Sequence, residues 1–195
     1  MPILPIIPDM RCQVSRAMIS LQSHKPHIKS RMEKIFMENQ EVRIITLPPL
    51  RVATFYVYSE YPEIEVWGKL VTWAKAHGMW KTPPETRIFG FDNPSSSEGS
   101  PNRGYELWLT VGREIQADEQ VKLKEFPGGL YGVLRCDVTT ADPFDIIPAS
   151  WQKLVRWLET SHYKLGKHQW LEEHLTRNEV GGQNFILDLY IPIVE

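Results

Sequence analysis

The sequence has few cysteines, no long apolar run and no recognisable leader. Only Cys12 and Cys136 occur among 195 residues, so neither a disulfide framework nor a cysteine-rich metal site is expected. No stretch reaches the roughly 20 apolar residues that a membrane helix needs. The apolar start carries three prolines and no basic segment, unlike a signal peptide. These absences predict a cytoplasmic protein without a membrane partner.

The chain also has little net charge. It carries 22 basic and 24 acidic residues, for a formal net charge of -2 at pH 7. A domain that binds DNA or RNA directly is usually basic, at least on one face, so no direct nucleic-acid partner is expected. The hydrophobic fraction of 42% and the charged fraction of 24% are typical of a globular protein. The length fits one main domain.

Common motifs for metal, phosphate and acyl chemistry are missing. The six histidines do not form the H-x-x-x-H pattern with an acidic partner on one helix. Neither a glycine-rich phosphate loop nor a G-x-S-x-G serine turn occurs. We therefore expect no bound metal and no cofactor.

The first forty residues differ from the rest. Residues 1–40 open with prolines, then become polar and basic, and 28–37 has the spacing of a short helix. We interpret them as an N-terminal arm that adds little to the core, and a poorly ordered terminus fits equally well. Residues 41–195 form the predicted domain.

Two segments in that domain carry the same sequence pattern. The stretches WGKLVTW and WQKLVRW share W-x-K-L-V-x-W, which is an internal repeat within two predicted helices. The helices are expected at about Pro62–His77 and Pro148–Thr160. Alternating segments predict strands at 42–47, 51–59, 87–91, 105–111, 121–126, 130–138 and 185–194, with 169–176 helical or extended.

The repeat predicts the architecture. Each half gives a strand, then a tryptophan-containing helix, then more strand. Two such βαββ-like halves would form one antiparallel sheet with both helices on one face, an α+β fold. The other face must then be covered or hold a ligand.

The ordered segments LPPLRVATFYVYS, RIFGFDNP, NRGYELWLTV, EFPGGLYGVLRCDV, WQKLVRWLETSHYKLGKHQWLEEH and LDLYIPI resemble GyrI-like small-molecule-binding domains. Such domains are found alone and as effector domains of AraC-type and MerR-type regulators. The resemblance implies a cleft between the halves that binds lipophilic cations beside a carboxylate. Forty residues cannot hold an AraC or MerR DNA-binding domain, so we expect a free-standing member.

Glu172, in QWLEEHL, matches the position of the family's acidic residue. A carboxylate facing an apolar cleft would favour a cationic ligand and would have a raised pKa, suited to acid or base work. The alternative is a solvated glutamate on a surface helix.

Further candidate ligand-binding residues are aromatic or acidic side chains near the expected cleft. Glu106 and Trp108 share one face of a strand, opposite Tyr105, and either line the cleft or are exposed. Tyr56 and Tyr58 alternate on the first long strand. The remaining candidates are Tyr131, Trp67 and Trp151.

Two hypotheses follow from these residues and the resemblance. In the first, the protein binds small, flat, aromatic and cationic compounds, as a drug-binding or drug-sensing protein. In the second, it hydrolyses cyclopropanoid or related electrophilic aromatic natural products, with Glu172 activating water. A weaker third hypothesis is an inhibitor of an enzyme such as gyrase. The sequence does not decide between binder and hydrolase, nor give the oligomeric state.

Overall fold

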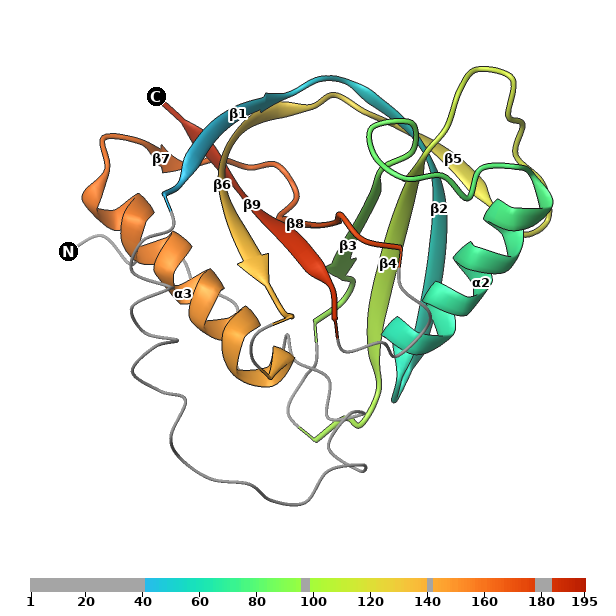
Figure 1. Ribbon diagram of the computed structural model, residues 1–195, viewed down its shortest axis with the longest axis horizontal. Helices are drawn as coiled ribbons and strands as arrows, with labels where there is room; N and C mark the ends of the chain where they lie inside the picture. The colour runs from blue at the N-terminus through green and yellow to red at the C-terminus, as the bar shows by residue number, and fades with distance from the viewer. Residues whose placement is uncertain (1–40, 96–98, 140–141, 178–183) are drawn as a thin grey trace.

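The computed structural model describes residues 41–95, 99–139, 142–177 and 184–195 (Figure 1). The predicted N-terminal arm lies outside these residues. The described part of the chain forms nine strands and two helices. In chain order they are β1 (Arg43–Leu47), β2 (Leu50–Ser59), α2 (Pro62–Ala76), β3 (Ile88–Asp92), β4 (Arg103–Thr110), β5 (Lys122–Phe126), β6 (Gly129–Asp137), α3 (Pro143–Thr160), β7 (Lys164–Leu165), β8 (Leu171–His174) and β9 (Ile186–Val194).

The strands form one antiparallel sheet built from two similar halves. The strand order is β1-β6-β9-β8-β3-β4-β2-β5, with β7 paired to β9. One half is β2-α2-β3-β4 and the other is β6-α3-β8-β9, and they join where β3 pairs with β8. Strand β1, which precedes the first half in the chain, pairs with β6 of the second half. Strand β5, which precedes the second half, pairs with β2 of the first half. The predicted α+β fold of two βαββ-like halves is confirmed.

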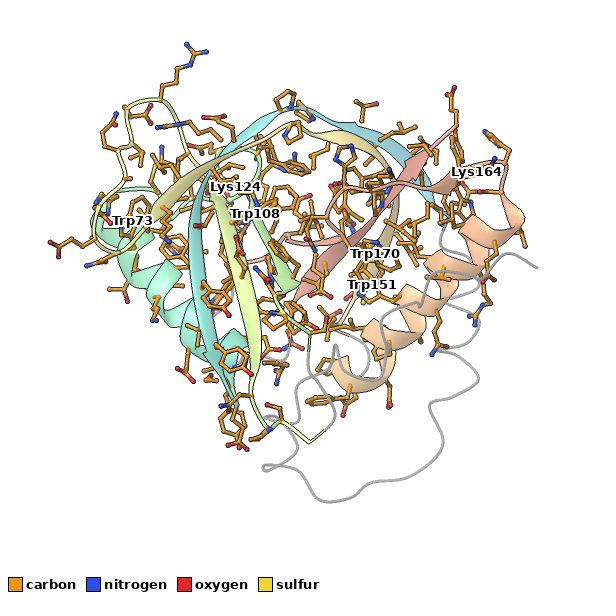
Figure 2. All side chains as sticks on the ribbon, turned by 180° about the vertical axis from the view of Figure 1, so that it is seen from behind. Trp73, Trp108, Lys124, Trp151, Lys164 and Trp170 are labelled. Carbon is orange, nitrogen blue, oxygen red and sulfur yellow. The ribbon has the colours of Figure 1, made fainter. Side chains whose placement is uncertain are left out.

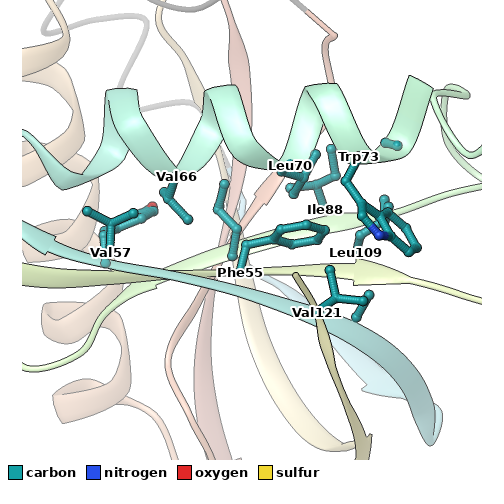
Figure 3. Packing of buried hydrophobic residues seen from close by; sticks show 12 residues of the cluster. Phe55, Val57, Val66, Leu70, Trp73, Ile88, Leu109 and Val121 are labelled. Carbon is teal, nitrogen blue, oxygen red and sulfur yellow. The ribbon is translucent and has the colours of Figure 1, made fainter. Parts of the chain in front are cut away.

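Both helices cover the same face of the sheet. Directly paired residues on neighbouring strands point to the same face. Leu109 pairs with Ile88, Ile88 with His174, and His174 with Leu187. Leu109 and Ile88 pack under α2 (Figure 3), whereas Leu187 belongs to the core under α3. One row of side chains therefore runs from one helix to the other across the sheet.

The opposite face is curled around a core of its own. The sheet arches in Figure 1, with α2 and α3 on its two flanks. Side chains from eight strands meet on this opposite face, and we call this group the inner core. Its buried members are Leu47, Val52, Phe89, Phe91, Trp108, Phe126, Tyr131, Val133, Leu171 and Tyr190. Curling lets strands far apart in the sheet share one apolar cluster, so this face is covered by the sheet itself.

The start of the second helix differs from the prediction. Helix α3 begins at Pro143, not near Pro148, and Pro148 lies inside it. The Asp142 side chain caps the helix by accepting a hydrogen bond from the Phe144 amide at 2.9 Å. A proline fits the first turn, where no amide donor is needed, and both Pro143 and Pro148 offer that signal. Neither helix of the described chain is long and apolar enough to cross a membrane.

Candidate ligand-binding site

Glu172 lies on strand β8, near the junction of the two halves. It pairs with Gly90 of β3 and Leu189 of β9, so its side chain is on the face that carries the helices. Its carboxylate accepts a hydrogen bond from the Tyr105 hydroxyl at 3.0 Å and another from Trp151 Nε1 at 3.0 Å. Tyr105 belongs to β4 and Trp151 to α3. Both halves of the fold therefore hold this one carboxylate.

Gly90 makes the contact between Tyr105 and Glu172 possible. A Cβ atom at this position would lie only 2.3 Å from the Tyr105 hydroxyl oxygen. Gly90 pairs with Glu172, and Tyr105 lies diagonally across from Gly90 on β4, so the missing side chain leaves the space that the phenol occupies.

The charge of Glu172 is not balanced by a cation within the described residues. Burial raises the pKa of Glu172, while the hydrogen bonds from Trp151 and Tyr105 act in the opposite direction. Burial, followed by the charge of Glu172, raises the pKa of Tyr105 well above 10, so its phenol stays neutral and donates. Among the described residues no arginine or lysine forms an ion pair with Glu172.

Two further carboxyl groups lie close to Glu172. Asp92 ends strand β3, pairs with Tyr105 and shares its face of the sheet. Burial, then the charges of Glu172 and Glu63, raise the pKa of Asp92 to about 8 against the opposing effect of Arg103. Glu63 of α2 is itself bound by the Arg103 guanidinium. The site therefore combines three carboxyl groups with one arginine.

Asp92 and Tyr105 were not among the residues predicted from sequence. Tyr105 lies on the strand face opposite Glu106 and Trp108, packs under α2, and its hydroxyl reaches Glu172. Asp92 stands before a loop rich in serine and proline, where an aspartate is commonplace. Only the pairing of β3 with β4 and β8 brings these residues to Glu172.

The two repeat-equivalent tryptophans approach β8 from opposite halves. Trp151 is 2% exposed, and its ring lies 5.3 Å from that of Trp170 (Figure 2). Trp67 is partly exposed, and its ring lies 4.8 Å from that of His174, two residues after Glu172. Burial, then the charge of Arg177, lowers the pKa of His174 to about 3, so this ring is neutral.

The structure separates the other predicted residues from Glu172. Trp108 and Tyr131 are buried in the inner core, on the opposite face of the sheet. Tyr56 and Tyr58 point away from the α2 core and are 47% and 50% exposed. The prediction grouped all of these with Glu172 because strand alternation shows which residues share a face but not which faces meet.

Glu106 forms a second glutamate–tryptophan pair on that opposite face. Its carboxylate accepts hydrogen bonds from Trp108 Nε1 at 2.6 Å and from the Asn93 side-chain nitrogen Nδ2 at 2.7 Å. Lys124 Nζ lies 4.5 Å from the Trp108 ring centroid (Figure 2). The strand that carries Glu106 and Trp108 thus presents Tyr105, not these residues, to Glu172. Within the described residues, no group of three or more histidine, cysteine, aspartate or glutamate side chains is placed to hold a metal ion.

A family comparison fits this arrangement. The model of the GyrI-like small molecule binding domain matches residues 40–194. The chain belongs to this family. No curated protein sequence matches the chain at a significant level. The GyrI-like family assignment therefore stands on the domain model.

Solved structures show the same fold at low sequence identity. The EcmrR C-terminal domain superposes with a TM-score of 0.58 at 13% identity, covering 80% of this chain and 99% of that one. A hydrolase from Listeria innocua gives a TM-score of 0.56 at 12% identity, with coverages of 85% and 98%. SAV2435 bound to tetraphenylphosphonium gives 0.51 at 12% identity, with coverages of 79% and 94%.

EcmrR also matches as part of a DNA complex. The match to the EcmrR chain of that complex covers only 64% of the length of EcmrR. The absence of a direct nucleic-acid partner stays a prediction from the charge balance.

Proposed function

We propose that this GyrI-like domain binds a small, flat, aromatic cation at Glu172. The observation that carries the proposal is a largely buried carboxylate held by two neutral donors, Tyr105 and Trp151, with no cation paired to it among the described residues. An ionised carboxylate in such surroundings has lost much of its hydration. A ligand cation would restore a favourable partner for that charge.

The aromatic side chains beside Glu172 supply the second part of the proposal. Trp67 and Trp170 are both partly exposed and lie next to His174 and Trp151 respectively. Tryptophan faces attract cations and stack on flat rings. The structure of SAV2435, a protein with a similar fold, contains bound tetraphenylphosphonium, which is a cation with aromatic rings. Charge and ring contacts together would select flat cations over anions.

Glu172→Gln tests this proposal because it keeps the side-chain shape and removes the charge. We expect the affinity for proflavine, a flat cation, to fall roughly 10- to 150-fold. This range corresponds to the loss of one hydrogen bond to a charged group, which contributes about 1.5–3 kcal/mol. Acridone, a neutral molecule of similar shape, should lose far less. Anthracene-1-sulfonate should bind the native protein more weakly than proflavine. Dye fluorescence and tryptophan quenching report all three affinities.

Glu106→Gln is the matched control for this experiment. Glu106 is also a glutamate that accepts a hydrogen bond from a tryptophan, but it lies on the opposite face of the sheet. Its amide variant should leave proflavine affinity unchanged. Equal affinities of the native protein and the Glu172→Gln variant for proflavine would contradict the proposal, as would a loss caused by Glu106→Gln alone.

A second candidate function is hydrolysis of a cyclopropanoid aromatic compound. The observation that favours it is a second carboxyl group on the same face near Glu172, that of Asp92, whose raised pKa of about 8 keeps it protonated at neutral pH. A base and an acid side by side suit ring opening. Water would give its proton to Glu172 and bond to a ring carbon. The breaking carbon–carbon bond would pass its electron pair to the conjugated system, which takes a proton from Asp92.

Mass spectrometry of the ligand distinguishes the two functions. A hydrolase would add one water to a cyclopropanoid substrate, and Glu172→Gln should abolish that turnover while substrate binding remains measurable. A binder would return the compound unchanged. Turnover that persists in the Glu172→Gln variant would exclude the catalytic role of this residue.

A further inference from the structure

Three buried polar side-chain atoms in the described residues lack a hydrogen-bond partner. They are Asp92 Oδ2, Arg103 Nε and His174 Nε2. All three residues lie on the helix-bearing face around Tyr105 and Glu172, because Asp92 pairs with Tyr105, Arg103 is two residues before it, and His174 is two residues after Glu172. Buried polar atoms without partners are rare in folded proteins. Along the strands, His174 lies level with Ile88 on one side of Glu172, and Asp92 lies on the other side next to Tyr105. The unpartnered Asp92 oxygen near Glu172 is therefore available to a bound molecule.

Asp92 has no ion-pair partner among the described residues. The cation that acts on its pKa is Arg103, which is only 6% exposed. Its terminal nitrogens are engaged by the Glu63 carboxylate and by the Glu60 carbonyl oxygen at 3.2 Å. This leaves two carboxyl groups, Asp92 and Glu172, without an ion-pair partner among the described residues.

The spacing of these two carboxyl groups sets the spacing of the charges they would bind. Glu172 pairs with Gly90, and Asp92 is two residues further along the same strand. Such diagonal neighbours on one face have Cα atoms about 7–8 Å apart, and their Cβ atoms are somewhat closer. A small aromatic ring with a cationic group at each end spans such a distance.

We propose that Asp92 forms a second cation subsite, so that the preferred ligand is an aromatic dication with one positive centre at Glu172 and the other at Asp92. This proposal rests on the proposed function at Glu172. Tyr105 pairs with Asp92 across β3 and β4 and is a neutral donor to Glu172. The groups that face Asp92 are Glu172 of β8, Glu63 of α2 and Arg103 and Tyr105 of β4.

Occupation of the second subsite is coupled to a proton. Burial raises the pKa of Asp92 to about 8, so the carboxyl is mostly protonated at pH 7. A second positive charge beside it would displace that proton. A dication should therefore bind with proton release and should gain affinity, relative to a monocation, as the pH rises from about 6 to about 9.

Benzamidine and benzene-1,4-dicarboxamidine form a matched pair of probes that differ in the second amidinium group. In calorimetric titrations of the native chain we expect the dication to bind about tenfold or more tightly than the monocation. Asp92→Asn should reduce the dication to the affinity of the monocation and leave the monocation little changed. Glu172→Gln should weaken both. Titration of the native protein at pH 7 in buffers of different ionisation enthalpy should show proton release for the dication only.

The outcomes separate this inference from the proposed function. If benzamidine binds in a Glu172-dependent way but the second amidinium adds no affinity and releases no proton, the second subsite is wrong and the proposed function stands. If Asp92→Asn weakens both probes equally, Asp92 is not a separate subsite. If neither probe binds, or Glu172→Gln affects neither, both proposals fail. The proton-release measurement uses only the native protein and so does not depend on how any variant folds.

Discussion

Arg87→Met is expected to lower the free energy of unfolding by about 3–5 kcal/mol, the usual cost of leaving one partner of a buried ion pair alone. Arg87 donates to both carboxylate oxygens of Glu173, from Nε at 2.6 Å and from a terminal nitrogen at 2.8 Å. The Glu173 side chain is only 4% exposed. Methionine preserves much of the length and apolar character of the arginine stem, so the loss would come from the stranded charge.

Among the described residues, Arg87 is the cation that forms an ion pair with Glu173. Arg135 and Arg177 interact with Glu173 only through their charge, because they donate their hydrogen bonds to Asp188 and to backbone carbonyl oxygens. The second donor to Glu173 is the Tyr190 hydroxyl at 2.6 Å, which is neutral. The burial of Tyr190 and the charge of Glu173 hold the pKa of that phenol far above its usual value, so it remains a donor. One neutral hydrogen bond cannot compensate for the desolvation of a full carboxylate charge. The stability of the Arg87–Glu173–Tyr190 network therefore depends on the positive charge of Arg87.

Chemical denaturation of three variants checks this expectation. Arg87→Met with Glu173→Gln removes both charges and should recover much of the stability that Arg87→Met loses. Lys81→Met breaks an exposed pair with Glu85 and should cost less than about 1 kcal/mol. A loss of less than about 1 kcal/mol in Arg87→Met would show that the buried charge is not decisive.

Asp92→Asn is expected to stabilise the protein at alkaline pH and to change it little near pH 4. In the unfolded chain this carboxyl loses its proton near its ordinary pKa of 3.8, whereas in the folded protein it keeps the proton up to about pH 8. Between these values the folded state binds more protons than the unfolded state. The free energy of unfolding therefore falls as the pH rises through this window.

The size of the effect follows from the width of the window. Each pKa unit corresponds to about 1.4 kcal/mol, so the native protein should lose up to about 5 kcal/mol relative to the variant between pH 4 and pH 9. At roughly 2–4 °C per kcal/mol, the variant should melt about 10–20 °C higher at pH 9. The asparagine keeps the shape of the protonated acid and never ionises.

Thermal unfolding of both proteins across this pH range measures the difference. The subtraction removes contributions from groups that do not interact with Asp92. A melting-temperature difference that is constant with pH would mean that Asp92 titrates in its ordinary range. That result would also withdraw the proton coupling inferred for the second cation subsite.

The two-halved fold could be predicted because its signals are local or repeated. The W-x-K-L-V-x-W pattern occurs in α2 and again in α3, and alternating segments precede and follow each helix. A pattern that occurs twice in the same order implies the same supersecondary unit twice. The start of α3 was misplaced because Pro143 and Pro148 give the same local signal, and only the Asp142 cap distinguishes them.

The site could be predicted only in part. Glu172 was singled out by its resemblance to a family motif, and its role remains a proposal. The sequence offered two glutamates beside tryptophan-rich segments, Glu172 and Glu106, and gave no reason to place them on opposite faces. Trp108 and Tyr131 have the composition of a ligand-binding wall, yet both are buried in the inner core. Composition alone does not distinguish a packed ring from one available to a ligand.

Local patterns predicted the two helices, the long strands, their order and the duplication, because hydrophobic periodicity and turn residues act over a few positions. Which residues meet at the centre depends on strand pairing. The register of β3 against β4 and β8 brings Asp92, Tyr105 and Glu172 to one face, and the missing side chain of Gly90 allows Tyr105 to touch Glu172. A shift of β3 by one residue would turn Asp92 to the opposite face, away from Tyr105 and Glu172. Register depends on contacts between strands far apart in the chain, which local patterns do not encode.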